Sequence, residues 1–283
     1  MTTVSIAADT KGSSILGDLF LILPFDLICH EIIPLVALDW LRVSREWYKV
    51  AFRCLLRDGR VDPSRCSNYA IQHAARKGHV KLIELLLADS RVDPGGWENL
   101  PILYASQEGH VEIVELLLAD KRVNPAAADN IAIRWAARTD HVRIVKLLLD
   151  DLRVNAAARD NKAIRWASAY GHAKVVALLL TDPRVNPAAK YNYAIKWAAA
   201  NGFDEVVDVL LADSRVDPSV CNNAPPRWAA EQGHDKVVEL LLVSGRVDLT
   251  EMMGNDLISD ATTKGFINVV TLIKSYLCAN TQL

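Results

Sequence analysis

Apolar residues in the middle of the chain follow a helical spacing twice in succession. Ile133, Ala136 and Ala137 stand at positions i, i+3 and i+4, which places them on one face of a helix. A second and more apolar run follows between Ile144 and Leu149. Because a short polar stretch separates the two runs, this part of the sequence predicts a pair of short helices joined by a turn.

The same pattern recurs along the chain with a period of 31 residues. The tetrapeptide R-V-D/N-P, or a close variant, begins at Arg60, Arg91, Arg122, Arg153, Arg184, Arg215 and Arg246. A second column holds Gly78, Gly109, Asp140, Gly171, Gly202 and Gly233, and slips by one residue to Gly265. A third column holds Asn68, Asn99, Asn130, Asn161, Asn192, Asn223 and Asn255. Three columns in register over seven copies define an internal repeat.

Each column suggests a local role. The asparagines precede the first helix of each pair, where we expect their side chains to cap free backbone N–H groups of that helix. The glycines follow the first helix, where a left-handed residue is needed, and Asp140 tolerates that conformation moderately well. In six copies the loop arginine follows an aspartate by two residues. We expect these residues to form a charge ladder between repeats, each exposed pair contributing about 0–1 kcal/mol.

One helix pair cannot bury its apolar faces alone, whereas a stack of copies can. At about 8–10 Å per packed layer, seven copies give an all-α rod of roughly 60–70 Å. We assign residues 59–279 to this array. In the last copy Lys274 replaces a leucine of the earlier copies, as expected for a terminal cap.

These repeats resemble ankyrin repeats, whose pattern is T-P-L-H-x-A-A, then G-H, then an apolar helix. The matching segments include Ala132–Ala137 and Ala194–Ala199, and the resemblance extends from about Arg60 to Leu277. The period is 31 instead of 33 residues, so we expect shortened loops. The resemblance implies an ankyrin-type helical solenoid that binds proteins, without catalysis and without a cofactor.

Within residues 16–58, the segment L-P-F-D-L begins at Leu23 and L-R-V-S-R-E-W begins at Leu41. This is similar to an F-box, whose pattern is L-P-x-E-L followed by L-x-x-V-C/S-R/K-x-W. The matching residues are Leu23, Pro24, Asp26, Leu27, Val43, Ser44, Arg45 and Trp47. The stretch between the two halves is shorter than usual. The resemblance implies docking to the Skp adaptor of a cullin–RING ubiquitin ligase. By the same resemblance, the adaptor would contact Leu23, Pro24, Leu27, Ile28, Ile32 and Ile33.

A structural alternative exists for the end of this segment. Shifting the repeat frame back by 31 residues from Gly78 reaches Trp47, and Ala51 to Leu56 then match the columns of the second helix. The segment is therefore either a working F-box or a degenerate capping repeat, and one helix can serve both purposes. We expect residues 1–15, which are small and polar, to be disordered.

Aromatic residues form a further column with the same period. Its members are His73, Tyr104, Trp135, Trp166, Trp197 and Trp228, and the last four follow the basic residues Arg134, Arg165, Lys196 and Arg227. Tryptophan and arginine are common in interface hot spots, so this column is a candidate surface for an acidic or aromatic peptide. The alternative is that each tryptophan packs on the neighbouring repeat beneath an arginine stem. Trp97, in a variable loop, is a further candidate contact.

Composition and motif content argue against a nucleic-acid-binding protein, a membrane protein and an enzyme. The 283 residues carry a net charge of -2, which argues against a nucleic-acid-binding protein. The longest apolar stretch is too interrupted by charge to span a membrane. Five scattered cysteines without a C-x-x-C pair suit a reducing compartment, cytoplasmic or nuclear. Histidines one repeat apart, about 10 Å, cannot share a metal ion, and we find no catalytic motif.

The sequence thus predicts a substrate receptor of an SCF-type ubiquitin ligase. The F-box-like segment would bind the adaptor and the repeats would bind an unidentified target, with the chain otherwise monomeric. The alternative is a binding scaffold without any link to ubiquitin.

Overall fold

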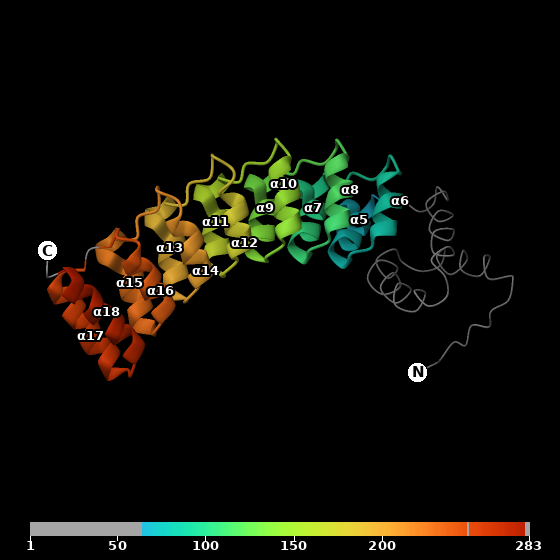
Figure 1. Ribbon diagram of the computed structural model, residues 1–283. Coiled ribbons are helices and arrows are strands. Elements are labelled where there is room, and N and C mark those ends of the chain that lie inside the picture. The colour runs from blue at the N-terminus through green and yellow to red at the C-terminus, as the bar shows by residue number, and fades with distance from the viewer. Residues whose placement is uncertain (1–63, 248, 281–283) are drawn as a thin grey trace, which may run out of the picture.

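A computed structural model describes residues 64–247 and 249–280, which form seven helix pairs (Figure 1). The first helices of the pairs are α5 (Arg65–Lys77), α7 (Gly96–Glu108), α9 (Ala127–Arg138), α11 (Ala158–Ala169), α13 (Ala189–Ala200), α15 (Val220–Gln232) and α17 (Glu251–Thr263). The second helices are α6 (Val80–Leu87), α8 (Val111–Ala119), α10 (Val142–Asp150), α12 (Ala173–Leu179), α14 (Asp204–Leu211), α16 (Asp235–Val243) and α18 (Ile267–Asn280). This part of the chain contains no β-strand, and the predicted all-α class is confirmed.

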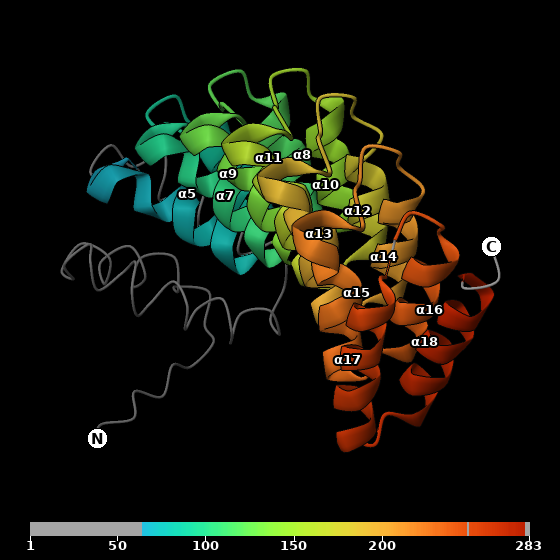
Figure 2. The ribbon, with the colours of Figure 1, turned by 90° about the vertical axis from the view of Figure 1, so that its left-hand side faces the viewer.

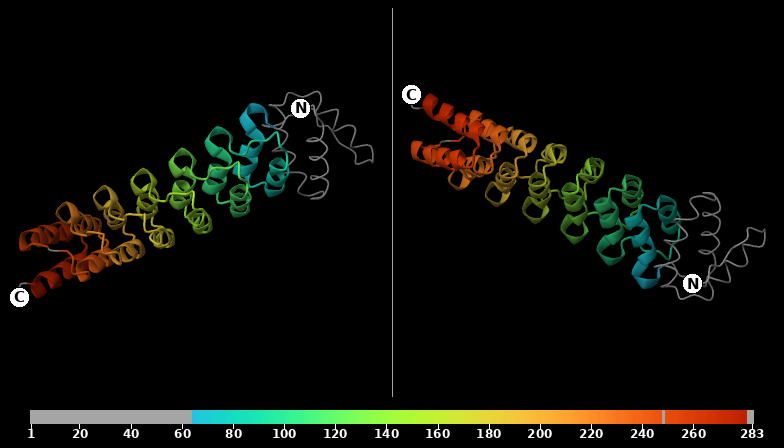
Figure 3. Two further views of the ribbon diagram at one scale, coloured as in Figure 1. Left: turned by 90° about the horizontal axis from the view of Figure 1, so that it is seen from above. Right: turned by 90° about the horizontal axis from the view of Figure 1, so that it is seen from below.

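The pairs stack in chain order into an elongated, curved array with two layers. First helices pack on the first helices of neighbouring repeats, and second helices pack on second helices (Figure 3). Figure 2 shows the array bending so that the layer of first helices lies on the inner side of the arc. We call the inner surface of α9, α11, α13 and α15 the first-helix face. The expected F-box-like segment and the expected disorder of residues 1–15 lie outside the described residues.

The buried core follows the predicted apolar columns. Ile133, Ala136 and Ala137 of α9 are fully buried, as are Ile144 and Leu148 of α10. Small alanines at the middle of each first helix allow the neighbouring first helix to approach closely. Each buried leucine or isoleucine contributes about 1.5–3 kcal/mol, and much of this burial depends on the adjacent repeat, so the array is the unit of stability.

The glycine column has two structural reasons. Gly109 adopts the predicted left-handed conformation, with φ 84°, and Asp140 adopts it with φ 61°. The His141 ring of the next repeat lies so close to Gly109 that a Cβ there would be 2.6 Å from its Cε1 atom. His141 Nε2 also donates a 3.0 Å hydrogen bond to the carbonyl oxygen of Gln107. The glycine therefore makes room for a histidine that links two repeats.

The asparagine column does not cap its own helix, so that prediction is wrong. Asn130 has a left-handed backbone, with φ 59°, and is buried. Its side-chain oxygen accepts a 2.6 Å hydrogen bond from the backbone N–H of Asn155, which lies in the loop of the next repeat. Equivalent bonds run from Asp93 to Asn68, Asn124 to Asn99, Asn186 to Asn161 and Asp217 to Asn192. The column fixes the register between repeats.

The loop arginines also act differently from the expected charge ladder. Arg122 donates hydrogen bonds to Asp120 within its own loop. The bond to the preceding repeat goes to a backbone group, because Arg122 Nη1 lies 2.9 Å from the carbonyl oxygen of Val92. Arg153, Arg184, Arg215 and Arg246 bind the equivalent valine carbonyls of the preceding repeats. The ion pair with the loop aspartate therefore orients the arginine. The contact between repeats is the hydrogen bond from that arginine to a main-chain carbonyl oxygen.

Candidate partner-binding face

A left-handed turn lies near the N-terminal end of five first helices among the described residues. Ala128, Asp129 and Asn130 have φ values of 47°, 55° and 59°. Three consecutive residues in this conformation are unusual, because each costs about 1–2 kcal/mol outside glycine. The same turn occurs at residues 97–99, 159–161, 190–192 and 221–223. Sequence reasoning missed this turn, although the asparagine that ends it is among the residues that tolerate a positive φ.

Arg134 stabilises the turn at the start of α9 by hydrogen bonds to two of its carbonyl oxygens. Its Nη2 atom donates a 2.8 Å hydrogen bond to the carbonyl oxygen of Ala128, and its Nε atom donates a 3.1 Å bond to that of Asp129. Arg134 is buried. Arg165 makes the corresponding bonds to Arg159 and Asp160 and remains half-buried. These two predicted contact residues therefore shape the face, and Arg134 offers little surface to a partner.

The aromatic column forms a ladder along the first-helix face. The ring centres of Trp135 and Trp166 lie 5.8 Å apart, and those of Trp197 and Trp228 lie 6.2 Å apart. Tyr193 extends the ladder, 5.7 Å from Trp197. Trp197 is 41% exposed, and the other three tryptophans are half-buried. Each of these two tryptophan pairs thus packs ring against ring between neighbouring repeats, and all four rings are partly exposed.

Three cations lie over this ladder. The guanidinium carbon of Arg138 lies 4.8 Å from the ring centre of Trp135 and 5.2 Å from that of Trp166. Lys162 Nζ lies 4.4 Å from the ring centre of Trp166. Cation–π contacts of this kind contribute about 0.5–2 kcal/mol. Arg138 and Lys162 were not among the predicted contact residues, although their spacing of three and four residues from a tryptophan is the signal for contact on a helix.

Arg165 is the third of these cations. Its guanidinium carbon lies 5.2 Å from the ring centre of Tyr193 on the next repeat. Arg138 also donates a 3.0 Å hydrogen bond to the hydroxyl of Tyr170, so each arginine joins two repeats through an aromatic ring. We call Arg138, Lys162, Arg165 and the Trp166 ring the cation–tryptophan cluster.

The helices that form the first-helix face differ in charge from the whole chain. Helices α9, α11, α13 and α15 carry eight lysine and arginine residues but three acidic residues, a net formal charge of +5. The whole chain has a net charge of -2. Asp129 is 2.7 Å from Arg159 and Asp160 is 3.0 Å from Lys190, so both aspartates are paired at the turns. Within the described residues, the cluster cations have no ion pair.

The environment of Lys162 reflects this imbalance. Loss of hydration lowers its pKa from the usual lysine value, and repulsion from Arg134, Arg165, Arg159 and Arg138 lowers the pKa further. An anion at the surface would stabilise the charged form of Lys162, which lies near four arginines.

The remaining predicted contact residues lie apart from the cluster. Trp97 is 67% exposed at the left-handed turn that begins α7. Lys196 lies 3.8 Å from the sulfur of Cys221, and Arg227 lies 3.9 Å from Glu231. Tyr191, at the turn of α13, is 79% exposed. Leu23, Pro24, Leu27, Ile28, Ile32 and Ile33, the predicted adaptor contacts, lie outside the described residues.

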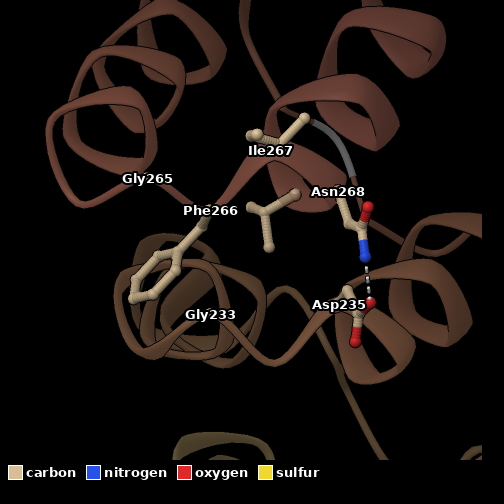
Figure 4. A pocket seen from close by; sticks show the side chains of 7 residues that line it. Gly233, Asp235, Gly265, Phe266, Ile267 and Asn268 are labelled. Carbon is tan, nitrogen blue, oxygen red and sulfur yellow. Dashed lines mark hydrogen bonds between the residues drawn. The ribbon is translucent and has the colours of Figure 1, made fainter.

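A pocket at the C-terminal end of the array is part of the contact between repeats (Figure 4). It lies where the period slips by one residue. The Phe266 ring covers Gly233, and Asn268 donates a 2.9 Å hydrogen bond to Asp235. No group of three metal-ligating side chains occurs in residues 64–247 and 249–280. Among the helices described, none is long and apolar enough to cross a bilayer.

The geometry defines a helical solenoid with one aromatic and cationic face. Residues 48–129 match a family model that describes three copies of the ankyrin repeat. The comparison with curated proteins gives no match. The copies beyond residue 129 keep the same helix pair and the same glycine and asparagine columns. The described chain is therefore an ankyrin-type solenoid of about seven repeats, and ankyrin repeats imply binding to proteins.

Proposed function

We propose that the chain holds a target protein on its first-helix face and presents it to an SCF-type ubiquitin ligase. The observation that carries the binding part is the cation–tryptophan cluster, in which surface charge without an ion pair lies beside partly exposed rings. Arginine and tryptophan are enriched among the residues that contribute most to protein interfaces. The chain itself would perform no chemistry; its contribution would be the proximity of target and ligase.

The ligase part of the proposal is supported by sequence alone. The L-P-F-D-L segment begins at Leu23, and the V-S-R-x-W segment begins at Val43, in the order that an F-box requires. A repeat cap does not need the first of these motifs. The Skp adaptor would contact the apolar residues that follow Leu23.

A second candidate function is a binding scaffold without a link to ubiquitin. The specific observation that favours it is the start of the ankyrin match at residue 48, inside the F-box-like segment. Residues 48–58 then count as part of a repeat, in agreement with the frame that places Ala51 to Leu56 on a second helix. The two candidates differ in whether residues 23–33 bind the adaptor.

Co-purification with a Skp adaptor distinguishes the two candidates. The intact chain is compared with the double variant Leu23→Ala/Leu27→Ala. The control is Val243→Ala/Met252→Ala, which removes two exposed apolar side chains at the opposite end of the array. We expect stoichiometric adaptor binding by the intact chain and the control, and its loss in the Leu23→Ala/Leu27→Ala variant. A well-folded intact chain that fails to bind the adaptor would exclude the ligase role and leave the scaffold.

A further inference from the structure

The positive charges of the cation–tryptophan cluster lack acidic partners among the described residues. Arg138, Lys162 and Arg165 form no ion pair within the described residues, whereas the nearby Asp129 and Asp160 are each paired with another cation. Lys162 has no hydrogen-bond acceptor among the described residues and lies against the Trp166 ring. The absence of an acidic partner in the described part of the chain favours an anionic ligand over a neutral one.

We propose that the first-helix face binds an extended acidic segment of the partner protein at the cation–tryptophan cluster. This inference rests on the proposal that this face holds the target. One carboxylate would pair with Lys162 and a second with Arg138, and the intervening chain would cross the edge of Trp166. Arg165, half-buried beside Tyr193, would add positive charge toward the next repeat.

The two charges are near enough for one short segment to reach both. Both charges lie within 5.2 Å of the centre of the Trp166 ring, so Lys162 Nζ and the Arg138 guanidinium carbon are no more than about 10 Å apart. An extended chain advances about 3.3 Å per residue, so carboxylates two residues apart lie roughly 7 Å from each other. Flexible glutamate side chains cover the difference.

A protein segment fits the face better than a nucleic acid does. Arg138 already lies over Trp135 and Trp166, and Lys162 also lies over Trp166, so these rings are less available for stacking against bases. Single-stranded nucleic acids rely on such open aromatic faces. The net charge of -2 over the whole chain also opposes long polyphosphates, whereas a short acidic segment meets the local positive charge alone.

Fluorescence anisotropy with the full chain tests the proposal. The probe is a fluorescein-labelled peptide of about twelve residues with alternating glycine and glutamate, which places carboxylates two residues apart. The control probe replaces every glutamate by glutamine, and a uridine RNA of the same length forms a third arm. The variants are Lys162→Gln and Lys174→Gln, the second an exposed lysine on α12. Arg138→Gln is a further variant, and circular dichroism checks that each variant is folded.

We expect the glutamate peptide to bind and the glutamine peptide not to bind. Lys162→Gln should weaken binding about tenfold, as expected for the loss of one charge-assisted hydrogen bond, and Lys174→Gln should leave it unchanged. Higher salt should weaken binding, since screening acts on exposed charges. Equal losses in the two lysine variants would overturn the proposal, because binding would then follow net charge alone. RNA binding that is tighter than peptide binding and is lost in Lys162→Gln would overturn it in favour of a nucleic acid.

The adaptor experiment separates this inference from the proposed function. A chain that co-purifies with the adaptor but does not bind the glutamate peptide would overturn the acidic partner and leave the ligase proposal standing. Peptide binding that depends on Lys162, by a chain that does not bind the adaptor, would support the inference and exclude the ligase.

Discussion

Asn130 and Asn155 belong to neighbouring repeats, and the side-chain oxygen of the first accepts a 2.6 Å hydrogen bond from the backbone N–H of the second. Asn130 is also the last of the three left-handed residues near the start of α9. One side chain thus sets both the local backbone and the register to the next repeat. The same pairing occurs at five of the junctions in the described array.

Replacing Asn130 should therefore destabilise the array strongly. Asn130→Ala leaves the N–H of Asn155 without its acceptor, at about 1–3 kcal/mol, and places alanine at a positive φ, at about 1–2 kcal/mol. We expect a total loss of roughly 2–5 kcal/mol in the free energy of unfolding, measured by urea denaturation. The control Asn155→Ala removes an exposed side chain whose bond stays within its own loop, and should cost less than about 1 kcal/mol. Equal effects of the two variants would contradict the proposed role of Asn130.

The glycine column offers a test that separates backbone strain from crowding. Gly109 and Gly265 both have positive φ values, 84° and 78°. A Cβ at Gly109 would meet the His141 ring at 2.6 Å, whereas a Cβ at Gly265 would meet nothing within 4 Å. Gly265→Ala should therefore cost about 1–2 kcal/mol through the backbone, and Gly109→Ala should cost more. Thermal unfolding of both variants measures the difference, and equal shifts would show that the histidine ring moves aside freely.

Acid should weaken the links between repeats. A hydrogen bond from Arg153 holds the pKa of Asp151 below its ordinary value of 3.8, and the same arrangement lowers the pKa of Asp89, Asp120, Asp182 and Asp213. Because the folded-state pKa is the lower one, each pair stabilises the fold fully above pH 3.8 and loses that effect as the pH falls through the folded value.

We expect the urea concentration at the unfolding midpoint to decrease as the pH falls below about 4. Asp151→Asn should lower stability at pH 7 and reduce the loss on acidification. Asp208→Asn, at an exposed position on α14, should change neither. An unchanged acid response in Asp151→Asn would contradict the assignment of this response to the loop pairs.

Two buried serines should lower stability where other repeats hold alanine. The hydroxyls of Ser106 and Ser168 are buried without a hydrogen-bond partner, whereas Ala137 and Ala199 occupy the same column. An unsatisfied buried hydroxyl costs about 1–3 kcal/mol. Ser168→Ala should therefore raise the free energy of unfolding, and the reverse change Ala199→Ser should lower it. A loss of stability in Ser168→Ala would show that its hydroxyl has a partner in solution.

The sequence predicts the architecture well because the repeat multiplies weak local signals. Helix pairs, the left-handed glycine positions and the buried column through Ile133 all follow from spacing. The partners of Asn130 and Arg122 could not be predicted, since both bind backbone groups of an adjacent repeat and main-chain groups carry no sequence signal. The left-handed turns were not predicted either, because several of their residues, such as Ala128, carry no preference for a positive φ.

The candidate site was predicted in part. The 31-residue spacing of the tryptophans identified their column but not their burial. A residue beside the buried face of a helix can be either packed against a neighbour or exposed to solvent. Arg134 belongs to the predicted basic column but is buried, and its guanidinium group donates hydrogen bonds to the carbonyl oxygens of the turn. Arg138 and Lys162 lie outside the repeating basic column, so the sequence pattern did not indicate their contacts with the tryptophan rings.

Hydrogen–deuterium exchange of the full chain with saturating glutamate peptide tests the central claim most directly. If the partner occupies the first-helix face, amide protection should increase in α9, α11 and α13 and remain unchanged in α10, α12 and α14. Protection confined to the second helices, or no protection at peptide concentrations that saturate the anisotropy signal, would contradict the claim that this face binds the partner.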